Sequence, residues 1–271
     1  MKHQLERAAG IHVAAALLRH KPERIGDIWF KAGTRNARLE KLRRQAAAAG
    51  VRSHELDQAG LDRLLPAVRH QGVVVSFEAD NLLDEGDLEP LIAAAAEPLV
   101  VVLDGVTDPH NLGACLRTAE AAGATAVVIP RDRAAELTPA ARRAAAGAAE
   151  LLPLVRVVNL ARALRRLKQG GLWLAGTAGE AAQTLYEHDL NRPLAVVLGA
   201  EEHGMRRLTA ELCDFQMRIP LTGRVESLNV SVAAGVVLFE VRRQRTMIRA
   251  MAPPQSPLAG ERAGAIRDIS Q

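Results

Sequence analysis

Polar and charged side chains gather at three points of the sequence, each in the stretch that follows a short apolar run of the kind that forms a buried strand. The first group begins at Asp104 and includes Asp108 and His110. These side chains could bind a metal ion, but the Asp-Gly and Asp-Pro pairs that contain both aspartates are typical of turns. We therefore expect turn chemistry at this point and no metal site.

Asn111 and Arg117 follow in the same stretch, within a segment of small residues that predicts a helix. Asn is favoured at the N-cap of a helix, so we expect Asn111 to begin this one. A guanidinium among small apolar side chains, as at Arg117, requires a partner. That partner is either a carboxylate of the protein or a bound phosphate, and the sequence leaves both alternatives open.

The second group runs from Gly199 to Gly204 and contains Glu201. Two glycines around an acidic residue at the end of a strand allow the backbone to approach a ligand closely, with Glu201 directed toward it. The pattern alone is weak, because a simple left-handed turn before a helix would use the same residues. The chain contains neither the Walker sequence nor the GxGxxG dinucleotide fingerprint.

The third group comprises Ser227, Asn229 and Ser231, which lie just before a segment that becomes apolar. One such residue suffices as an N-cap, so the surplus predicts contacts with a ligand. The GxSxG signature is missing, which argues against a hydrolase with a catalytic triad.

The elements that must position these groups alternate along residues 99–246. Apolar runs predict strands at 99–103, 126–129, 154–157, 172–175, 194–198 and 215–219, and the stretches between them predict helices at 111–122, 138–149, 159–169, 205–212 and 227–245. Near-continuous apolar strands separated by helices indicate an α/β fold with a mostly parallel sheet covered on both faces. Ligands bind beyond the carboxyl ends of such strands, which is where all three polar groups are expected.

The preceding residues predict a small α/β domain of their own. Its expected helices are 3–20, 35–49 and 57–65, and its expected strands are 25–30 and 72–76. Residues 78–98 are acidic and contain two prolines, so we expect a linker there between domains at 1–77 and 99–246. The composition of residues 247–271 predicts a disordered tail.

Composition limits how the chain could bind its partners. Of 35 basic residues 30 are Arg, whose planar fork suits phosphate, and basic residues exceed the 31 acidic ones by four. Seven side chains are Phe, Trp or Tyr, so base stacking is not expected as the main means of RNA recognition. Two separated cysteines, the lack of a signal-peptide pattern and the lack of a long apolar run predict a cytoplasmic protein that does not bind a membrane.

Taken together and in this order, the three groups resemble the three motifs of the SpoU branch of the SPOUT RNA methyltransferases. The matching stretches begin at Asp108, Gly199 and Ile219, and the resemblance extends over roughly residues 8–245. Within that branch, the chain is most similar to the bacterial enzymes that methylate a guanosine ribose of 23S rRNA.

The resemblance implies a C-terminal domain with a parallel sheet and a deep trefoil knot, and an N-terminal RNA-binding domain related to ribosomal protein L30e. It implies S-adenosylmethionine as the cofactor, contacted by the residues Gly199, Ile219, Leu228 and Thr177. It also implies a homodimer in which both chains touch each site. The basic run 31–44 would contact phosphates of the RNA.

The implied reaction transfers a methyl group to a ribose 2′-hydroxyl in the peptidyl-transferase region of 23S rRNA, without a metal. The hydroxyl must lose its proton, and the resemblance assigns its activation to Arg117. Because a guanidinium scarcely deprotonates, we expect Arg117 to hold the adjacent phosphate and stabilise the developing alkoxide. Glu201 is the alternative proton acceptor. The ribose and Arg117 would be oriented by Asn111, Ser227 and Asn229.

Three alternatives stay open at this point. The first is a tRNA 2′-O-methyltransferase of the same superfamily, and the second is a non-catalytic RNA-binding protein that has kept the fold. The third, a nucleotide-binding Rossmann enzyme, is disfavoured by the missing glycine fingerprint.

Overall fold

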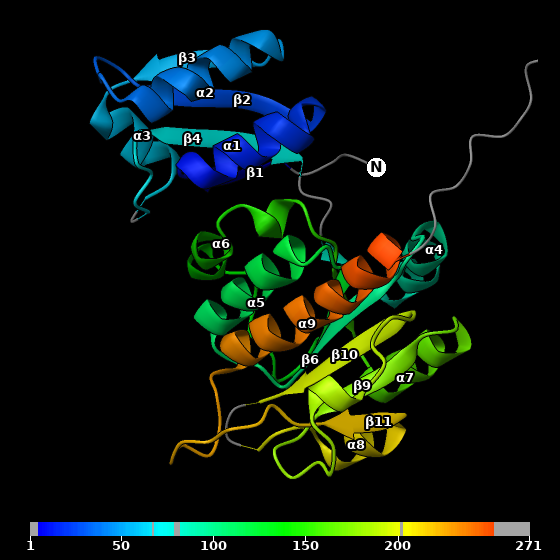
Figure 1. Cartoon of the computed structure of the whole chain (residues 1–271). Helices are drawn as coiled ribbons and strands as arrows, with labels where there is room; N and C mark the ends of the chain where they lie inside the picture. Colours follow the sequence, from blue (N-terminus) through cyan, green and yellow to red (C-terminus); the bar gives the residue numbers. More distant parts are fainter. Residues whose placement is uncertain (1–4, 67, 79–81, 201–202, 252–271) are drawn as a thin grey trace, which may run out of the picture.

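The computed structural model describes residues 5–66, 68–78, 82–200 and 203–251. The chain forms a four-stranded sheet with strand order β1-β4-β2-β3 and a seven-stranded sheet with order β11-β9-β10-β6-β7-β8-β5. Each sheet has its own helices and lies in its own half of the molecule (Figure 1). The described residues therefore form two α/β units.

The N-terminal unit is built around a central strand, β4. Its elements are β1 Leu5–Ala9, α1 Ile11–His20, β2 Ile25–Lys31, α2 Ala37–Ala48, β3 Arg52–Leu56, α3 Gln58–Leu64 and β4 Val73–Glu78. β4 pairs antiparallel with β1 and β2, and β2 pairs parallel with β3. α1 and α2 bury Leu17 and Leu39 against Phe30 of β2, whereas α3 buries Leu61 against the other face.

The expectation of one helix over residues 3–20 is wrong, because residues 5–9 form strand β1. Gly10 separates the strand from α1 with φ of 112°, a value that no helix interior accommodates. Pairing with β4 supplies hydrogen bonds that the local sequence pattern does not reveal. β3 was not expected from the sequence either, because this edge strand is almost entirely exposed and lacks an apolar run.

The C-terminal unit contains all six strands expected between residues 99 and 219. Its elements are β5 Leu82–Leu83, α4 Leu88–Ala94, β6 Leu99–Asp104, α5 Pro109–Ala121, β7 Ala126–Pro130, α6 Pro139–Ala145, β8 Leu154–Val157, α7 Leu160–Gln169, β9 Trp173–Thr177, β10 Leu194–Gly199, α8 Arg207–Leu212, β11 Phe215–Met217 and α9 Val230–Met251. Every strand pairing found in the described part of this sheet is parallel.

Both faces of the large sheet are buried, as the continuous apolar strands predict. Val101 and Leu103 face a core that includes α5 and α9, whereas Val100 and Val102 face a core that includes α4 and α7. α5 and α9 lie side by side across one face (Figure 1). This packing brings the starts of two helices that carry polar motifs to the same part of the molecule.

Several expected boundaries differ from the structure. Residues 82–94 of the expected linker form β5 and α4, and β5 pairs with β8 at the edge of the large sheet. α6 ends at Ala145, because Ala146 adopts a left-handed conformation with φ of 51°. α9 begins three residues later than expected, at Val230, and continues five residues beyond 246. The rest of the expected tail, 252–271, lies outside the described residues.

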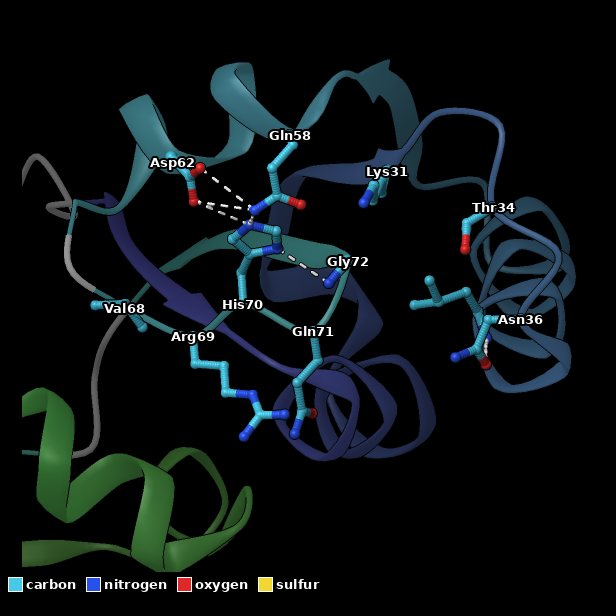
Figure 2. A pocket seen from close by; sticks show the side chains of 11 residues that line it. Lys31, Thr34, Asn36, Gln58, Asp62, Val68, Arg69, His70, Gln71 and Gly72 are labelled. Carbon is cyan, nitrogen blue, oxygen red and sulfur yellow. Dashed lines mark hydrogen bonds and ion pairs between the residues drawn. The ribbon is translucent and has the colours of Figure 1, made fainter.

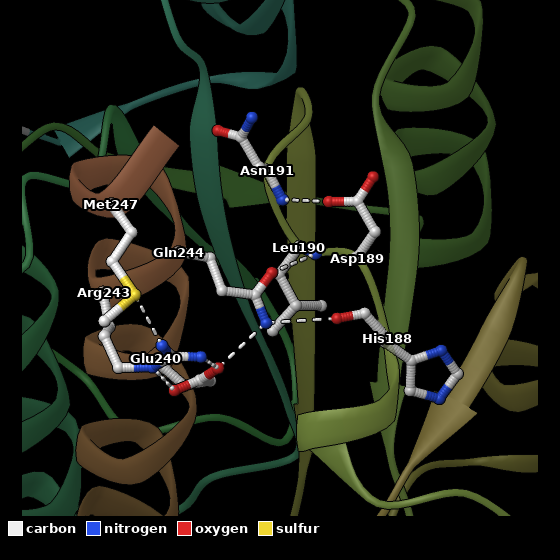
Figure 3. A network of polar contacts seen from close by, with 8 residues as sticks. All are labelled: His188, Asp189, Leu190, Asn191, Glu240, Arg243, Gln244 and Met247. Carbon is white, nitrogen blue, oxygen red and sulfur yellow. Dashed lines mark hydrogen bonds and ion pairs between the residues drawn. The ribbon is translucent and has the colours of Figure 1, made fainter. Parts of the chain in front are cut away.

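Polar side chains fix the last helix to the loop between β9 and β10. Gln244 accepts a hydrogen bond from Leu190 N (2.8 Å) and donates to His188 O (3.1 Å) and to Glu240 (2.9 Å), as Figure 3 shows. Arg245 is buried and donates to the carbonyl of Pro98 (3.2 Å), just before β6. These contacts fix the orientation of α9 relative to the sheet.

Within the described residues, no helix is both long and apolar enough to cross a membrane.

The two units contact each other through α1, α6 and the short 3-10 turn Ala148–Glu150. Lys21 donates to the carbonyls of Glu150 (3.1 Å) and Leu151 (3.2 Å). Arg142 of α6 bridges Glu150 (2.9 Å) and Glu6 (2.5 Å) of the N-terminal sheet. Charged groups therefore join the two units directly.

Candidate active site

A pocket of about 450 Å³ lies at the carboxyl ends of β9, β10 and β11. Its walls come mainly from residues 177–180, 198–200, 203–205, 216–219 and 226–228. These are the loops after three neighbouring parallel strands and the segment that leads into α9. The pocket thus lies where an open parallel sheet binds its ligands.

The structure brings together all four residues expected to contact a cofactor. Thr177, Gly199, Ile219 and Leu228 all line this pocket: the first two end strands β9 and β10, and the other two lie on the segment between β11 and α9. Ser227 lines it as well. The walls are partly apolar, with backbone from several strand ends, which suits a ligand that combines an apolar body with a few polar groups.

The turn after β10 explains why residue 199 is glycine. A Cβ atom there would lie 2.1 Å from the carbonyl carbon of Gly204. The turn folds back on itself, because Ala200 N donates to Gly204 O (3.1 Å) and Gly204 N donates to Ala200 O (2.9 Å). The space that glycine leaves at position 199 is therefore filled in part by the backbone of Gly204, and not only by a ligand. Glu201 lies outside the described residues.

Asn111 and Asn229, from the first and third motifs, are hydrogen-bonded to each other. Asn229 Nδ2 donates to Asn111 Oδ1 at 2.9 Å. The expectation that Asn111 caps α5 is wrong, because Asp108 occupies the N-cap and accepts from His110 N (3.0 Å). The side chain of Asn111 is consequently available to Asn229.

Asn229 is also the residue of the third motif that holds the start of α9. Its Oδ1 atom accepts from Ser231 N (2.9 Å) and Ser231 Oγ (2.6 Å). Ser231 is therefore bound within the motif, whereas Ser227 is exposed and lines the pocket. The surplus polar residue expected at this helix start is Ser227.

Arg117 lies exposed on α5, and neither a hydrogen bond nor an ion pair of its side chain is found within the described residues. Both alternatives for its partner stay open, because Glu201 and Glu202 lie outside the described residues. Arg117, Asn111 and Asn229 are not among the residues that line the pocket. The structure of one chain therefore does not bring the expected catalytic arginine to the expected cofactor residues.

Sequence reasoning missed the ion pair between Asp104 and Arg206. Asp104 is the last residue of β6, in register with Gly199, and its side chain is fully buried. It accepts hydrogen bonds from Arg206 N (2.9 Å) and Arg206 Nε (2.6 Å). This contact fixes the end of the turn that forms one wall of the pocket. An aspartate that ends an apolar run was the available signal.

Two further sequence expectations concern charged or reactive groups. In the basic run 31–44, Arg43 is engaged internally, since it pairs with Glu55 and donates to Lys31 O (3.0 Å), so it does not form part of a free cationic face. Within the described residues no cluster suited to a metal ion is found. Near the pocket, burial raises the pKa of Cys213 to about 12, so this thiol stays protonated and is not a nucleophile.

Solved structures with the same fold include an RNA 2′-O ribose methyltransferase, which is 26% identical with a TM-score of 0.70 over 90% of each chain. The SpoU methyltransferase AviRb from Streptomyces viridochromogenes, in complex with AdoMet, has a TM-score of 0.71 at 24% identity, over 90% of this chain and 91% of that one. The fold and its pocket thus define the RNA methyltransferase class.

Within that class the family is clear. Residues 98–239 match the SpoU rRNA Methylase family, and residues 8–83 match the family described as RNA 2′-O ribose methyltransferase substrate binding. The chain belongs to the SpoU rRNA Methylase family. It is 52% identical over 247 residues to the 23S rRNA (guanosine-2′-O-)-methyltransferase RlmB of Pseudomonas putida, covering 91% of this chain and 99% of that protein. The corresponding protein of Haemophilus influenzae is 50% identical over 241 residues, covering 89% and 98%.

Proposed function

We propose that this chain is an S-adenosylmethionine-dependent methyltransferase that modifies the ribose 2′-hydroxyl of a guanosine in 23S rRNA. The choice of rRNA and guanosine rests on the relatives near 50% identity, which the chain matches over almost their whole length. The observation that carries the proposal is the pocket in which Thr177, Gly199, Ile219 and Leu228 meet. Placement of the guanosine in the peptidyl-transferase region rests on the family resemblance.

The pocket fits this cofactor in size and chemistry. Its volume of about 450 Å³ lies within the range for small-molecule sites. Leu198, Met205 and Leu228 would surround the apolar parts of the ligand, and the carboxylates of Glu180 and Glu226 would pair with its amino group. When bound, S-adenosylmethionine supplies an electrophilic methyl group on its sulfonium sulfur. Gly199 and its neighbours would hold that ligand largely through the backbone.

The remaining chemistry concerns the ribose hydroxyl, which is a poor nucleophile until it loses its proton. Arg117 would hold the phosphate next to the target ribose and stabilise the oxygen as negative charge develops on it. The hydrogen-bonded pair Asn111 and Asn229 would orient the ribose, together with Ser227. Glu201 is the candidate proton acceptor.

A homodimer would bring the arginine to the pocket. Arg117 does not line the pocket of its own chain, so it would serve the site of a second copy. α9 offers a surface for such an interface, because Val232 (52% exposed) and Phe239 (53% exposed) lie seven residues apart on one side of the helix. Exposed apolar side chains at this spacing form a stripe suited to a partner helix.

The finer features of the fold belong to the same proposal. The order of strands supports a trefoil knot. After β10, the chain passes to the far side of β9, where β11 pairs with it, and then returns to pack α9 on α5. An L30e-like fold for the N-terminal domain, with domains at 1–77 and 99–246, is supported by the substrate-binding family match at 8–83. Action on rRNA supports a cytoplasmic location.

Methyl transfer from labelled S-adenosylmethionine to purified 23S rRNA and to bulk tRNA tests the proposal. We expect label in unmodified 23S rRNA and none in tRNA. Label in tRNA alone would favour the tRNA-modifying alternative. Cofactor binding without transfer to either RNA would favour the non-catalytic one.

A further inference from the structure

The N-terminal domain contains a cavity of about 320 Å³ that is separate from the methyl-transfer pocket. It lies between the loop that follows β2 and the turn that precedes β4 (Figure 2). None of the residues that line it lies in the C-terminal domain. The methyl-transfer chemistry leaves this cavity without a role.

A strained turn forms one wall of the cavity. Gln71 has φ of 53° and Gly72 has φ of 85°, so two consecutive residues are left-handed. Such a conformation is uncommon for a residue other than glycine and persists where the surrounding structure enforces it. Gln71 accepts a hydrogen bond from Ile11 N (3.3 Å), which ties the turn to the start of α1. The turn, at the edge of the cavity, is thus fixed to α1.

Buried His70 forms the adjoining part of the wall. It is 4% exposed, and its Nδ1 atom accepts a hydrogen bond from Gly72 N at 3.0 Å. Nε2 lies 3.2 Å from Asp62 Oδ1 and 2.8 Å from the Gln58 amide (Figure 2). Gln58 in turn donates to Asp62 (3.2 Å). This network fixes the wall and occupies the one carboxylate that lines the cavity.

Unlike this carboxylate, the two cations at the cavity have no partner among the described residues. Lys31 and Arg69 line it, and neither side chain has a hydrogen bond or an ion pair within the described residues. Thr34 lines the cavity too, and its hydroxyl likewise has no partner there. Two cations without a partner among the described residues, in a cavity whose one carboxylate is already occupied, create a site for an anion with a polar neighbour.

We propose that this cavity binds one unstacked nucleotide of the RNA substrate. Lys31 and Arg69 contact phosphates on its two sides, and Thr34 faces its base. Among the described residues that line the cavity there is no Phe, Tyr or Trp, so the base is recognised through hydrogen bonds to its edge and not through stacking. This inference rests on the proposed function, because it takes RNA as the ligand. It adds a second binding point on the substrate, in a different domain from the methyl-transfer pocket.

The test compares Lys31→Ala/Arg69→Ala with Arg19→Ala/Arg63→Ala in the full-length chain. Both pairs remove two exposed or half-exposed positive charges from the same domain, but neither Arg19 nor Arg63 lines the cavity. Methylation of a 23S rRNA transcript is measured against RNA concentration, and RNA binding is measured against salt concentration. Thermal melting of each variant establishes that it is folded.

We expect Lys31→Ala/Arg69→Ala to raise KM for RNA about tenfold or more, with kcat at saturating RNA and the Kd for S-adenosylmethionine unchanged. The slope of log affinity against log salt should fall by about 0.7 for each phosphate that the variant no longer binds. Thr34→Val should raise KM with no change in that slope, because it removes a hydroxyl and no charge. The control pair should change KM less than twofold.

The inference is overturned if the two double variants behave alike, or if KM and the salt slope stay at their wild-type values. Failure of the proposed function gives a different result, since the wild-type chain itself would then transfer no methyl group to 23S rRNA. Even then, loss of RNA affinity in Lys31→Ala/Arg69→Ala alone would support the nucleotide site.

Discussion

The side-chain amide of Asn229 donates a hydrogen bond of 2.9 Å to the side-chain oxygen of Asn111, across 118 positions of sequence. The contact joins the start of α9 to the first turn of α5 and hence the third motif to the first. The hydrogen bond therefore holds the starts of the two helices together. Arg117 lies on the same helix as Asn111.

Removal of this hydrogen bond should slow methylation. We expect Asn111→Ala to lower kcat about 10- to 100-fold, because an orienting hydrogen bond in the site contributes about 1–3 kcal/mol. Asn229→Ala should do the same and also lower the free energy of unfolding by about 1 kcal/mol, because Asn229 holds the start of α9.

A double-mutant cycle separates the pair from its parts. If the two residues act together, Asn111→Ala/Asn229→Ala should be little worse than the poorer single variant. Ser231→Ala removes only a hydrogen bond within the motif and is the matched control. Losses in kcat that simply multiply would contradict a shared role.

Arg117→Ala should reduce methylation by at least about 100-fold, because the guanidinium is expected to stabilise charge that develops on the 2′-oxygen. Cofactor binding, measured by calorimetry, should persist, because Arg117 does not line the pocket. Arg117→Lys should recover little of the activity, since an ammonium cannot reproduce the planar fork. Turnover near the wild-type rate would remove Arg117 from the mechanism.

Mixing of inactive variants tests which chain supplies the arginine. Leu228→Arg places a charge in the pocket and should abolish cofactor binding. If Arg117 serves the pocket of a second copy, co-folding of Arg117→Ala with Leu228→Arg should restore activity, because mixed dimers contain one intact site. If each chain is self-sufficient, the mixture should stay inactive.

Asp104→Asn should weaken cofactor binding about tenfold, since the loss of a charge-assisted hydrogen bond costs about 1–3 kcal/mol. The substitution frees the Arg206 end of the turn that forms one wall of the pocket. Titration of S-adenosylmethionine measures the effect. Arg207→Ala, whose exposed side chain pairs with Glu211 on the same helix, should bind the cofactor like the wild type. Equal affinities for all three proteins would show that the pair does not position the pocket.

Glu150 should make the stability of the domain contact depend on pH. Burial raises the pKa of its carboxyl above the ordinary value of 4.5, Arg142 opposes this shift, and the negative charge of Glu6 adds to it. The Lys21 ammonium also lies nearby, where it donates to the carbonyl oxygen of Glu150. The folded state therefore favours the protonated acid, and this stabilisation is lost as pH rises through the folded pKa. Thermal melts of Glu150→Gln and wild type should diverge from pH 5 to pH 7.5, with the wild type becoming relatively less stable. Parallel curves would contradict the assignment.

The sequence predicts the sheet of the C-terminal domain well because its strands are continuous apolar runs. It fails at Leu5–Ala9 and Arg52–Leu56, where pairing with distant strands determines the structure and the local pattern does not. β5 was hidden in the same way, because two residues carry no periodicity. The family motifs led to the four pocket residues, which come from two strand ends and from the segment between β11 and α9.

Interactions between the motifs could not be predicted from the sequence. Asn111 has the right residue type for a cap, but Asp108 three positions earlier takes that role and leaves Asn111 to Asn229. The pairing of Asp104 with Arg206 spans 102 positions, so no local pattern could reveal it. The relation between Arg117 and the pocket depends on a second copy of the chain in our proposal.

The most direct test is the position of the methyl group in the RNA product. Unmodified 23S rRNA is incubated with the protein and methyl-labelled S-adenosylmethionine and is then hydrolysed with alkali, which cleaves only where the 2′-hydroxyl is free. We predict that the label remains in a single alkali-stable dinucleotide whose first nucleoside is guanosine. Label released in mononucleotides, which places the methyl group on a base, or label on the ribose of a different nucleoside would contradict the proposed function.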